Sequence, residues 1–328
     1  MHVPLIVWVL TIAGVVALLT FDFFTHIRKP HEPTIREAGL WTAIYVSLAV
    51  LFGIGVWIGW THQHGIEFFA GYLTEYSLSI DNLFVFLIIM STFGVPRQYQ
   101  QKVLMVGIIL ALIFRGIFIV LGAAIIENFS WIFYIFGVFL LYTGWKLAQG
   151  EDEDEEYKEN AFIRIVRRIF PVTNDYVGDA VVVHQDGRRM ITPMAIVMLA
   201  IGSTDLLFAF DSIPAIFGLT QEPYIVFTAN AWALLGLRNL YFLLGGLLER
   251  LVYLSYGLAF ILAWIGVKLI VHAMHENEVP FINGGNPIEW VPEIPTWLSL
   301  VVIIVTVAIA AFFSLRKTRA DANGVAAE

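Results

Sequence analysis

The stretch E-Y-S-L-S-I-D-N at residues 75–82 is matched in outline by the stretch D-L-L-F-A-F-D-S at residues 205–212. Each has two carboxylates six residues apart, followed directly by Asn or Ser, inside an otherwise apolar run. A charged side chain at the centre of a bilayer costs at least about 2.5 kcal/mol, so such residues are rare and usually functional. The two stretches lie 130 positions apart and predict a cation site that two internal repeats share, which is typical of a transporter.

The composition places the chain among membrane proteins. It is 59% hydrophobic and 14% charged, whereas soluble domains average about 25% charged residues. The absence of cysteine excludes disulfides, iron–sulfur clusters and thiolate metal sites. The net charge of −8 says little about partners, because residues 151–156 supply six of the negative charges. The first apolar run lacks a basic flank and is too long for a signal-peptide core, which predicts a retained first span.

Nine apolar stretches reach the length of about 20 residues that a membrane-spanning helix needs. We therefore expect an all-α polytopic membrane protein with about nine transmembrane helices. The expected spans are 4–24, 38–60, 67–93, 102–124, 130–148, 192–217, 224–247, 254–272 and 296–315. Fifteen of the 19 Lys and Arg lie in alternate loops and the C-terminal tail, and the intervening loops contain none. Because basic residues favour the cytoplasmic side, this pattern predicts an N-out, C-in topology.

The remaining basic residues lie within the spans and also match between the two halves. Arg115 and Arg238 are 123 positions apart, and Lys146 in G-W-K-L and Lys268 in G-V-K-L are 122 apart. Spans three to five thus correspond to spans six to eight. Because three is an odd number, the second copy is expected to run opposite to the first. Such an inverted repeat is common in secondary transporters, whose binding sites lie near the midplane at the repeat interface.

This organisation divides the chain into six segments. They are 1–60 with two N-terminal transmembrane helices, 67–149 with the first three-helix repeat, 150–191 as a cytoplasmic acidic loop with a hairpin, 192–272 with the second repeat, 273–295 as an outer loop, and 296–328 with the last transmembrane helix and a cytoplasmic tail. In the cytoplasmic loop, a basic amphipathic piece covers 161–170, and Asp186-Gly187 predicts a β-hairpin turn. A solvated linker and a regulatory or metal-sensing element both stay open for this loop.

The polar side chains of the two acidic stretches form an all-oxygen set of candidate metal ligands. The set comprises Glu75, Ser79, Asp81, Asn82, Asp205, Asp211 and Ser212. Oxygen ligands suit Mg²⁺, Ca²⁺ or Mn²⁺, whereas zinc or copper usually recruits Cys or several His. On one straight helix the two acids of a stretch point about 120° apart. We therefore expect a helix break that turns both toward one ion, and Pro214 predicts such a break beside Asp211.

Two intramembrane arginines leave a second interpretation open. Arg115 and Arg238 are expected to hold the acids in place or to set the charge balance. Acids within spans sometimes do no more than pair with arginine. Four acids against two arginines leave surplus negative charge, which favours an ion site. Proton carriage by one or more of the carboxylates also stays open, because burial disfavours the charged form.

Further candidates lie elsewhere in or near the spans. Asp22 is either a cytoplasmic-side ligand or a boundary charge. Asn230 and Asn239 are expected to line the pore or to join helices through hydrogen bonds. Histidines and acids of two outer loops are candidates for capturing a divalent cation at the outer mouth, or they are ordinary interfacial residues. They are His62, His64, His272, His275, Glu276 and Glu278.

At these motifs the chain resembles the TerC family of integral membrane proteins, including its Alx-type members. The matching stretches are E-Y-S-L-S-I-D-N-L-F-V-F (75–86), F-G-V-P (93–96), Y-T-G-W-K (142–146), S-T-D-L-L-F-A-F-D-S-I-P-A-I-F (203–217), T-A-N-A-W-A-L-L-G-L-R-N-L-Y-F-L-L (228–244) and G-V-K-L (266–269). The resemblance runs from about Asp22 to the end of the last span.

The resemblance implies a multi-pass protein of the bacterial cytoplasmic (inner) membrane, in the LysE-type exporter superfamily. Members of the family are linked to manganese efflux, and the family was named for tellurite resistance. The resemblance therefore implies export of Mn²⁺, and of related divalent ions, from the bacterial cytoplasm. Tellurite is harder to reconcile with the residues, because four carboxylates would repel an oxyanion.

We expect a secondary transporter that is not an enzyme and that exports divalent cations. No permanently bound cofactor is expected, and Mn²⁺ is the expected transported substrate. The expected partners are the lipid bilayer, the metal ion and, as an open alternative, protons as counter-ion; no nucleic acid is expected, and the oligomeric state stays open. The alternative function is a non-transporting membrane partner in a tellurite-resistance, stress-resistance or secretion-linked complex. Sequence motifs of metalloproteases, serine hydrolases and ATPases are absent.

Overall fold

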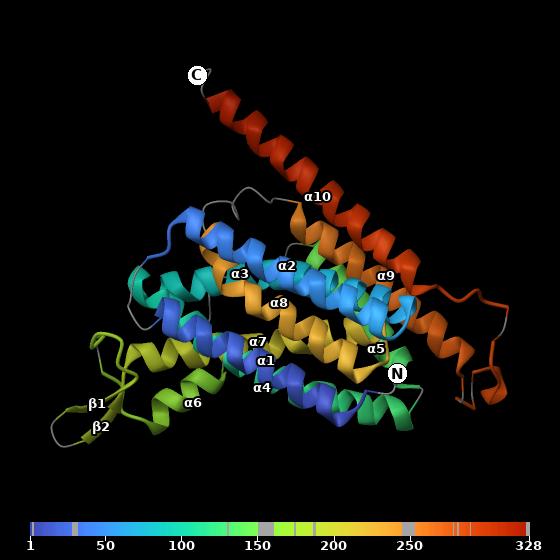
Figure 1. The fold of residues 1–328 in the computed structure, drawn as a ribbon, viewed down its shortest axis with the longest axis horizontal. Helices are drawn as coiled ribbons and strands as arrows, with labels where there is room; N and C mark the ends of the chain where they lie inside the picture. The colour runs from blue at the N-terminus through green and yellow to red at the C-terminus, as the bar shows by residue number, and fades with distance from the viewer. Residues whose placement is uncertain are drawn as a thin grey trace.

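A computed structural model gives the fold of residues 1, 3–27, 32–129, 131–149, 161–173, 175–185, 188–244, 253–277, 279–280, 282–288 and 290–325. The side chain of Asp81 lies outside this described part. The chain forms a bundle of long helices that lie side by side, with a small two-stranded sheet beyond one end (Figure 1).

The described part of the chain contains ten α-helices and two strands. The α-helices are α1 (Leu5–Asp22), α2 (Ile35–Gly59), α3 (His62–Thr92), α4 (Arg97–Asn128), α5 (Ile132–Ala148), α6 (Ala161–Ile169), α7 (Pro193–Phe217), α8 (Pro223–Leu244), α9 (Leu254–His275) and α10 (Thr296–Val325). A π-helical turn, Phe23–Ile27, continues α1, and a 3₁₀ turn, Asn283–Gly285, precedes α10.

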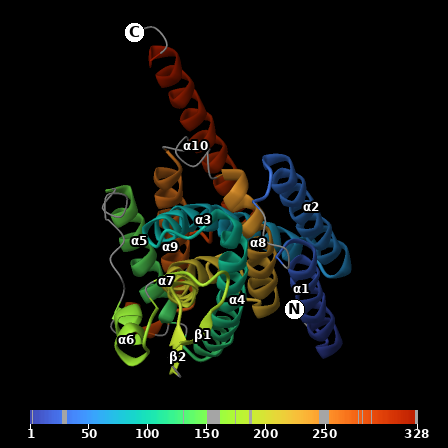
Figure 2. The ribbon, with the colours of Figure 1, turned by 90° about the vertical axis from the view of Figure 1, so that its left-hand side faces the viewer.

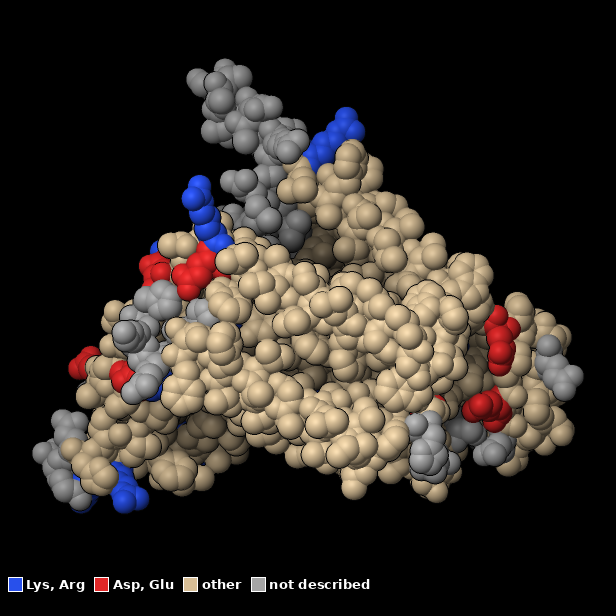
Figure 3. Space-filling model, in the orientation of Figure 1, with Lys and Arg blue, Asp and Glu red and all other residues tan. Residues whose placement is uncertain are grey.

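Seven of the described helices are long and apolar enough to cross a membrane, namely α1, α2, α3, α4, α7, α9 and α10. Helix α5 is apolar but has 17 residues, which gives a length of about 26 Å. The prediction of an all-helical membrane protein is thus confirmed, with seven or eight apolar helices of membrane length. On the face drawn in Figure 3, the body of the bundle shows a broad belt without charged side chains.

Besides α5, helix α8 is the other expected span that does not meet these criteria of length and composition. It carries Asn230, Arg238 and Asn239, yet most of its described side chains are buried and none is exposed. It packs against α1, α2, α3 and α4, and it lies inside the bundle in both ribbon views (Figures 1 and 2). Because its neighbours shield α8 from lipid, this helix tolerates polar side chains that a lipid-facing helix would not.

Several helix ends follow from local sequence. The side chain of Thr34 accepts a hydrogen bond from the Glu37 amide (3.2 Å), and Thr61 accepts one from the His64 amide (3.2 Å). These bonds satisfy amide groups that the first turn of a helix leaves without an intrahelical partner. The turn between α3 and α4 needs Gly94, which has a φ of +61°, a value that glycine adopts at little cost.

The described residues 161–173, 175–185 and 188–192, between α5 and α7, cover the end of the bundle where α3 ends and α4 begins. Strand β1 (Val182–Gln185) pairs antiparallel with β2 (Arg188–Ile191), so the expected hairpin is formed. Its turn at 186–187 and the acidic run at 151–156 lie outside the described residues. Lys102 of α4 binds the carboxylate of Asp179 (2.7 Å), and its ammonium lowers the pKa of Asp179.

Helices α5 and α9 cross closely through small residues. A Cβ atom added at Gly137 would lie 2.8 Å from the carbonyl oxygen of Gly266. A Cβ atom added at Gly144 would lie 2.8 Å from the carbonyl oxygen of Ala259. Small residues allow two membrane helices to approach in this way, where packing drives helix association.

Replacing Gly137 with valine is therefore expected to force α5 and α9 apart. The expected loss in free energy of unfolding is about 1–3 kcal/mol, which is the usual cost of overpacking a close contact. The thermal midpoint of the purified protein in detergent measures this loss. The matched control is Gly14→Val, because a Cβ atom at Gly14 meets no other atom within 4 Å. Equal midpoints for the two variants would contradict the expected crossing.

Candidate functional site

The two acidic stretches lie on α3 and α7, which are neighbours in the bundle. Glu75 from α3 and Asp205 from α7 converge on the guanidinium of Arg115 from α4. Arg115 binds Asp205 in a bidentate manner, from Nε to Oδ2 (3.2 Å) and from Nη2 to Oδ1 (3.3 Å). Its Nη1 donates to Oε1 of Glu75. A guanidinium offers a rigid fork of donors that suits two carboxylates at once.

Neutral polar groups complete the surroundings of Arg115. Its Nη1 also donates to Oγ of Ser212 (3.0 Å) and to Oδ1 of Asn230 on α8 (2.8 Å). The hydroxyl of Ser79 donates to Oε1 of Glu75 (3.4 Å). The site therefore gathers side chains from α3, α4, α7 and α8.

This cluster is buried and contains more carboxylates than cationic groups. Glu75 is 0% exposed, and Arg115 and Asp205 are each 1% exposed. With both carboxylates ionised, two negative charges face one positive charge. Within the described part of the chain, Oε2 of Glu75 is buried and has no hydrogen-bond partner. A buried carboxylate oxygen without a donor is costly.

The remaining predicted ligands are Asp81, Asn82 and Asp211. Asn82 is buried on α3, and the side chain of Asp81 lies outside the described residues. Asp211 is half-buried, and its Oδ1 accepts a hydrogen bond from Thr143 of α5 (3.5 Å). Asp211 therefore contacts a different helix from those that surround Arg115.

The expected break at Pro214 does not occur, because α7 runs as one helix from Pro193 to Phe217. Pro214 removes a single backbone hydrogen bond in the last turn of the helix. The carbonyl oxygen of Pro214 still accepts from the Gly218 amide (2.9 Å). Since α7 stays regular, it presents Asp205 and Asp211 on different sides.

Arg238 lies in a second buried cluster, away from the acids that it was expected to hold. Its Nη2 donates to Oδ1 of Asp22 (2.6 Å) and to Oδ1 of Asn239 (3.1 Å), and its Nη1 donates to Gln101 (2.8 Å). Asp22 is 3% exposed. It is thus a buried ion-pair partner rather than a boundary charge, and it joins α1 to α8.

No group of three His, Asp or Glu side chains is placed to hold a metal ion within the described residues. Around Arg115, two carboxylates and several neutral oxygens are present, but the guanidinium occupies the space between the carboxylates. These oxygens have the chemistry that Mg²⁺, Ca²⁺ or Mn²⁺ prefers. A cation that bound both carboxylates would have to displace Arg115 from at least one of them.

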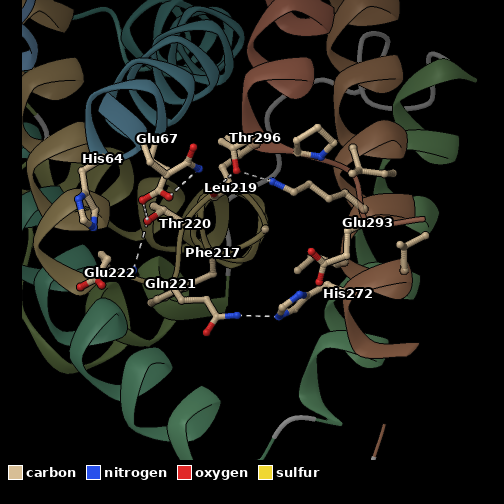
Figure 4. Close-up of a pocket in the computed structure, with 17 residues that line it drawn as sticks. His64, Glu67, Phe217, Leu219, Thr220, Gln221, Glu222, His272, Glu293 and Thr296 are labelled. Atoms are coloured by element: carbon tan, nitrogen blue, oxygen red, sulfur yellow. Dashed lines mark hydrogen bonds between the residues drawn. The ribbon is translucent and has the colours of Figure 1, made fainter. Parts of the chain in front are cut away.

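A pocket of about 500 Å³ opens near the first residues of α3 and the last residues of α7 (Figure 4). Its walls carry three carboxylates and two imidazoles, and Lys268 also lines it. The carboxylates and imidazoles are Glu67, Glu222, Glu293, His64 and His272. Oγ1 of Thr220 donates to Glu67 (2.7 Å), and Lys268 donates to Thr296 (3.1 Å).

Two of the six candidates from the outer loops, His64 and His272, line this pocket. The ring of His62 packs on Trp57 instead, with 5.2 Å between the ring centroids. His275 contacts the carbonyl oxygen of Val271 (3.1 Å). Glu276 lies 3.4 Å from His272, and Glu278 lies outside the described residues.

A narrow packed region separates this pocket from Glu75. Glu67 and Glu75 lie on the same helix, with Gly71 halfway between them. A Cβ atom at Gly71 would lie 3.3 Å from side-chain atoms of both Ile216 and Ala229. Ile216 and Ala229 are fully buried. Helix α3 therefore packs closely against α7 and α8 between the Arg115 cluster and the pocket.

Comparison with known proteins places the chain in a family. Residues 60–322 match the family described as "Integral membrane protein TerC family". The chain belongs to the TerC family. The match covers α3 to α9 and most of α10, so the Arg115 cluster lies entirely within it, whereas Asp22 lies outside it.

Relatives of this TerC family protein come from several bacteria. An uncharacterized membrane protein of Mycobacterium tuberculosis is 52% identical over 319 residues, which covers 95% of this chain and 80% of the relative. An uncharacterized membrane protein of Myxococcus xanthus is 42% identical over 264 residues, covering 80% and 83%. An Escherichia coli protein named "Putative membrane-bound redox modulator Alx" is 38% identical over 266 residues, covering 78% and 83%. No solved structure matches the chain.

Part of this site could be found from sequence, and part was missed. The sequence identified Glu75, Asp205, Arg115 and Ser212, and the structure brings them together. It did not identify Gln101 or Thr143 as partners, because polar residues of this kind are frequent at span ends and carry no motif. The signal for Asp22 was available: a second buried arginine needs an acid, and Asp22 lies at the end of a span.

Proposed function

We propose that this TerC family protein is a secondary transporter that exports divalent metal cations, with Mn²⁺ as its cargo, from the bacterial cytoplasm. The observation that carries the proposal is the pair Glu75 and Asp205, which two different helices bring to one guanidinium. With both carboxylates ionised, the pair would carry one negative charge more than Arg115 balances, and Oε2 of Glu75 is buried without a hydrogen-bond partner in the described part of the chain. A cation that enters this site gains both carboxylates once Arg115 moves aside.

The pattern of helix contacts supports the inverted repeat. If α3, α4 and α5 correspond to α7, α8 and α9, a two-fold axis relates the contact of α3 with α8 to that of α7 with α4. Both contacts are extensive. The close approach of Gly137 to Gly266 likewise corresponds to that of Gly144 to Ala259. From the first pair to the second, the residue number rises along α5, from 137 to 144, and falls along α9, from 266 to 259. The two helices therefore run in antiparallel directions.

A transporter with such a repeat works by moving one half against the other around a fixed site. Glu75 belongs to the first half and Asp205 to the second, so this motion changes the distance between them. The close packing at Gly71 lies between the site and the pocket. The N-out, C-in topology makes that pocket the exit, where Glu67, Glu222 and Glu293 would attract a departing cation.

The choice of cargo rests on ligand chemistry and on family resemblance together. The side chains around Arg115 offer oxygen ligands, and the chain has no cysteine. This set suits Mn²⁺, Mg²⁺ and Ca²⁺ better than zinc or copper. Manganese is singled out by the resemblance to TerC family members linked to manganese efflux.

The test is manganese content in a bacterial host that lacks its own manganese exporters. Expression of the wild-type chain is expected to lower cell manganese and to restore growth at high manganese. Glu75→Gln and Asp205→Asn are each expected to abolish both effects at equal membrane abundance, because each removes one carboxylate from the site. Asp175→Asn is the matched control, since Asp175 is an exposed residue in the segment between α5 and α7 and lies outside both the site and the pocket.

Two results would overturn this proposal. The first is cell manganese that the wild-type chain leaves unchanged while calcium or magnesium content falls, which would reassign the cargo. The second is full export by Glu75→Gln, which would remove Glu75 from the cation path.

The name of the Escherichia coli relative favours a second candidate, a redox modulator or a partner of other proteins that does not transport. This chain has no cysteine, so its own thiols are not available for such a role. A partner function would require a docking element, for which residues 150–191 are the candidate. Replacing the six acids of 151–156 with serine is expected to leave manganese export unchanged in a transporter and to destroy a docking function.

A further inference from the structure

Helix α6 (Ala161–Ile169), in the segment between the two halves, has three different sides. At 3.6 residues per turn, Ile163 and Val166 fall on one side of the helix. A second apolar side lies next to them. The third side, roughly opposite the second, is basic. The second side comprises Phe162, Ile165 and Ile169, and the third comprises Arg164, Arg167 and Arg168.

The first side fixes α6 to the end of the bundle. Ile163 is 0% exposed and Val166 is 8% exposed, and both belong to the apolar cluster that contains Met194. Met194 is the second residue of α7. The guanidinium of Arg167 lies 5.9 Å from the centroid of the Phe93 ring, directly after the end of α3. Helix α6 therefore lies at the level where membrane-length helices begin and end, near the bundle end seen in Figure 2.

The second side is large, apolar and uncovered. Phe162, Ile165 and Ile169 are 49%, 55% and 65% exposed. Phe170, directly after the helix, is 51% exposed. Soluble surfaces seldom carry contiguous apolar patches of this kind unless something binds them.

We propose that α6 lies in the headgroup region of the bilayer and binds anionic lipid. Phe162, Ile165 and Ile169 enter the boundary of the acyl chains, while Arg164 and Arg168 reach the lipid phosphates. An amphipathic helix with arginine on one side and large apolar residues on the other binds membrane interfaces in this way. Anionic lipids strengthen the binding through each nearby basic residue. The position of α6 beside the ends of the spans puts it at the required depth.

A second occupant of this surface is less well suited. The acidic run at 151–156 lies close in sequence and has charges opposite to those of Arg164 and Arg168. However, residues 150–160 contain no aliphatic side chain beyond that of lysine, and Tyr157 is their single aromatic residue. Such a segment offers little to cover three large apolar side chains, whereas lipid matches both the charge and the apolar surface.

Site-directed spin labelling tests this proposal. The chain has no native cysteine, so Ile165→Cys and Arg168→Cys each introduce a single labelling site. The full chain is placed in nanodiscs of phosphatidylcholine with or without phosphatidylglycerol. The nitroxide at 165 is expected to be accessible to oxygen and shielded from a water-soluble nickel chelate. The nitroxide at 168 is expected to show the reverse, because its side faces the headgroups and water.

A further variant tests how much the arginine charges of α6 contribute to binding of anionic lipid. Arg164→Gln combined with Arg168→Gln, in the Ile165→Cys background, is expected to remove the extra shielding that phosphatidylglycerol provides at position 165. The same variant retains Ile163 and Val166, so α6 stays attached to the bundle. Thermal stability in detergent, expected to be unchanged, verifies that attachment.

Three results would overturn the proposal. Equal access of the nickel chelate to labels at 165 and 168 would place both sides in water. Equal shielding at 165 with and without phosphatidylglycerol would exclude anionic lipid as the partner. Shielding at 165 that persists in detergent, and that disappears when the acids of 151–156 are replaced with serine, would assign the surface to the acidic run.

Discussion

Replacing Arg115 with leucine is expected to lower the free energy of unfolding by about 3–5 kcal/mol, the usual cost of breaking a buried ion pair by removing one partner. Glu75 and Asp205 would then face each other inside the bundle without a compensating cation, at 0% and 1% exposure. The denaturation midpoint of the purified protein in detergent, by heat or by sodium dodecyl sulfate, measures the loss. Arg115→Lys is expected to recover only part of it, because an ammonium cannot bind Asp205 in a bidentate manner.

A neutral triple variant separates charge from packing. Glu75→Gln and Asp205→Asn, added to Arg115→Leu, remove both carboxylates together with the guanidinium. Most of the lost stability is expected to return, because replacing a whole buried ionic group by neutral residues is often close to neutral. Manganese export is expected to stay absent. A triple variant as unstable as Arg115→Leu would show that packing of the Arg115 stem, rather than charge balance, holds the site together.

Replacing Asp22 with asparagine is expected to cost about 3 kcal/mol or more, because it leaves Arg238 as an uncompensated buried charge. Asp22 is the carboxylate within ion-pair distance of Arg238 in the described part of the chain, at 2.6 Å. The contacts of Arg238 with Gln101 and Asn239 are to neutral groups. The expected result is a lower denaturation midpoint, measured as for Arg115.

A double variant that removes both charges of the ion pair provides the control. Asp22→Asn combined with Arg238→Met removes both charges, and its denaturation midpoint is expected to approach that of the wild type. Asp22→Glu keeps the charge and is expected to cost less than Asp22→Asn. Additive losses for Asp22→Asn and Arg238→Met would show that the two residues do not stabilise each other.

The helices were predictable from sequence because a helix that crosses the hydrocarbon of a bilayer needs about 20 mostly apolar residues. Each apolar run of suitable length became a helix, and Thr34 and Gly94 mark helix ends that local chemistry also favours. The length rule is less decisive for α5 and α8. Helix α5 is shorter than a typical span. Helix α8 is stabilised in the bundle by burial among other helices rather than by its own hydropathy.

The spacing of residues along a helix determines the direction in which each side chain points, but not which side chains of other helices it contacts. The candidate site was therefore only partly predictable from sequence. The spacing of Asp205 and Asp211 led us to expect a helix break at Pro214 that turns both acids toward one ion, and this prediction was wrong because α7 is one continuous helix. The two matched arginines were assigned equivalent roles from their positions, yet Arg115 and Arg238 bind different acids. The partner of Arg238 is Asp22 of α1, a helix outside the expected repeat, whereas the partners of Arg115 lie on α3 and α7.

The buried position of α8 has a consequence for how the chain is made. As an isolated segment, α8 would enter a bilayer poorly, because a single arginine at the centre of a helix costs about 2.5–3.5 kcal/mol. The groups on other helices that Arg238 and Asn230 contact come earlier in the chain: Asp22 and Gln101 precede Arg238, and Arg115 precedes Asn230. During synthesis from the N-terminus, α1 to α4 would already be in the membrane when α8 leaves the ribosome. The order of the helices thus allows α8 to pack against helices that are already in the membrane, so that its polar side chains do not have to enter lipid.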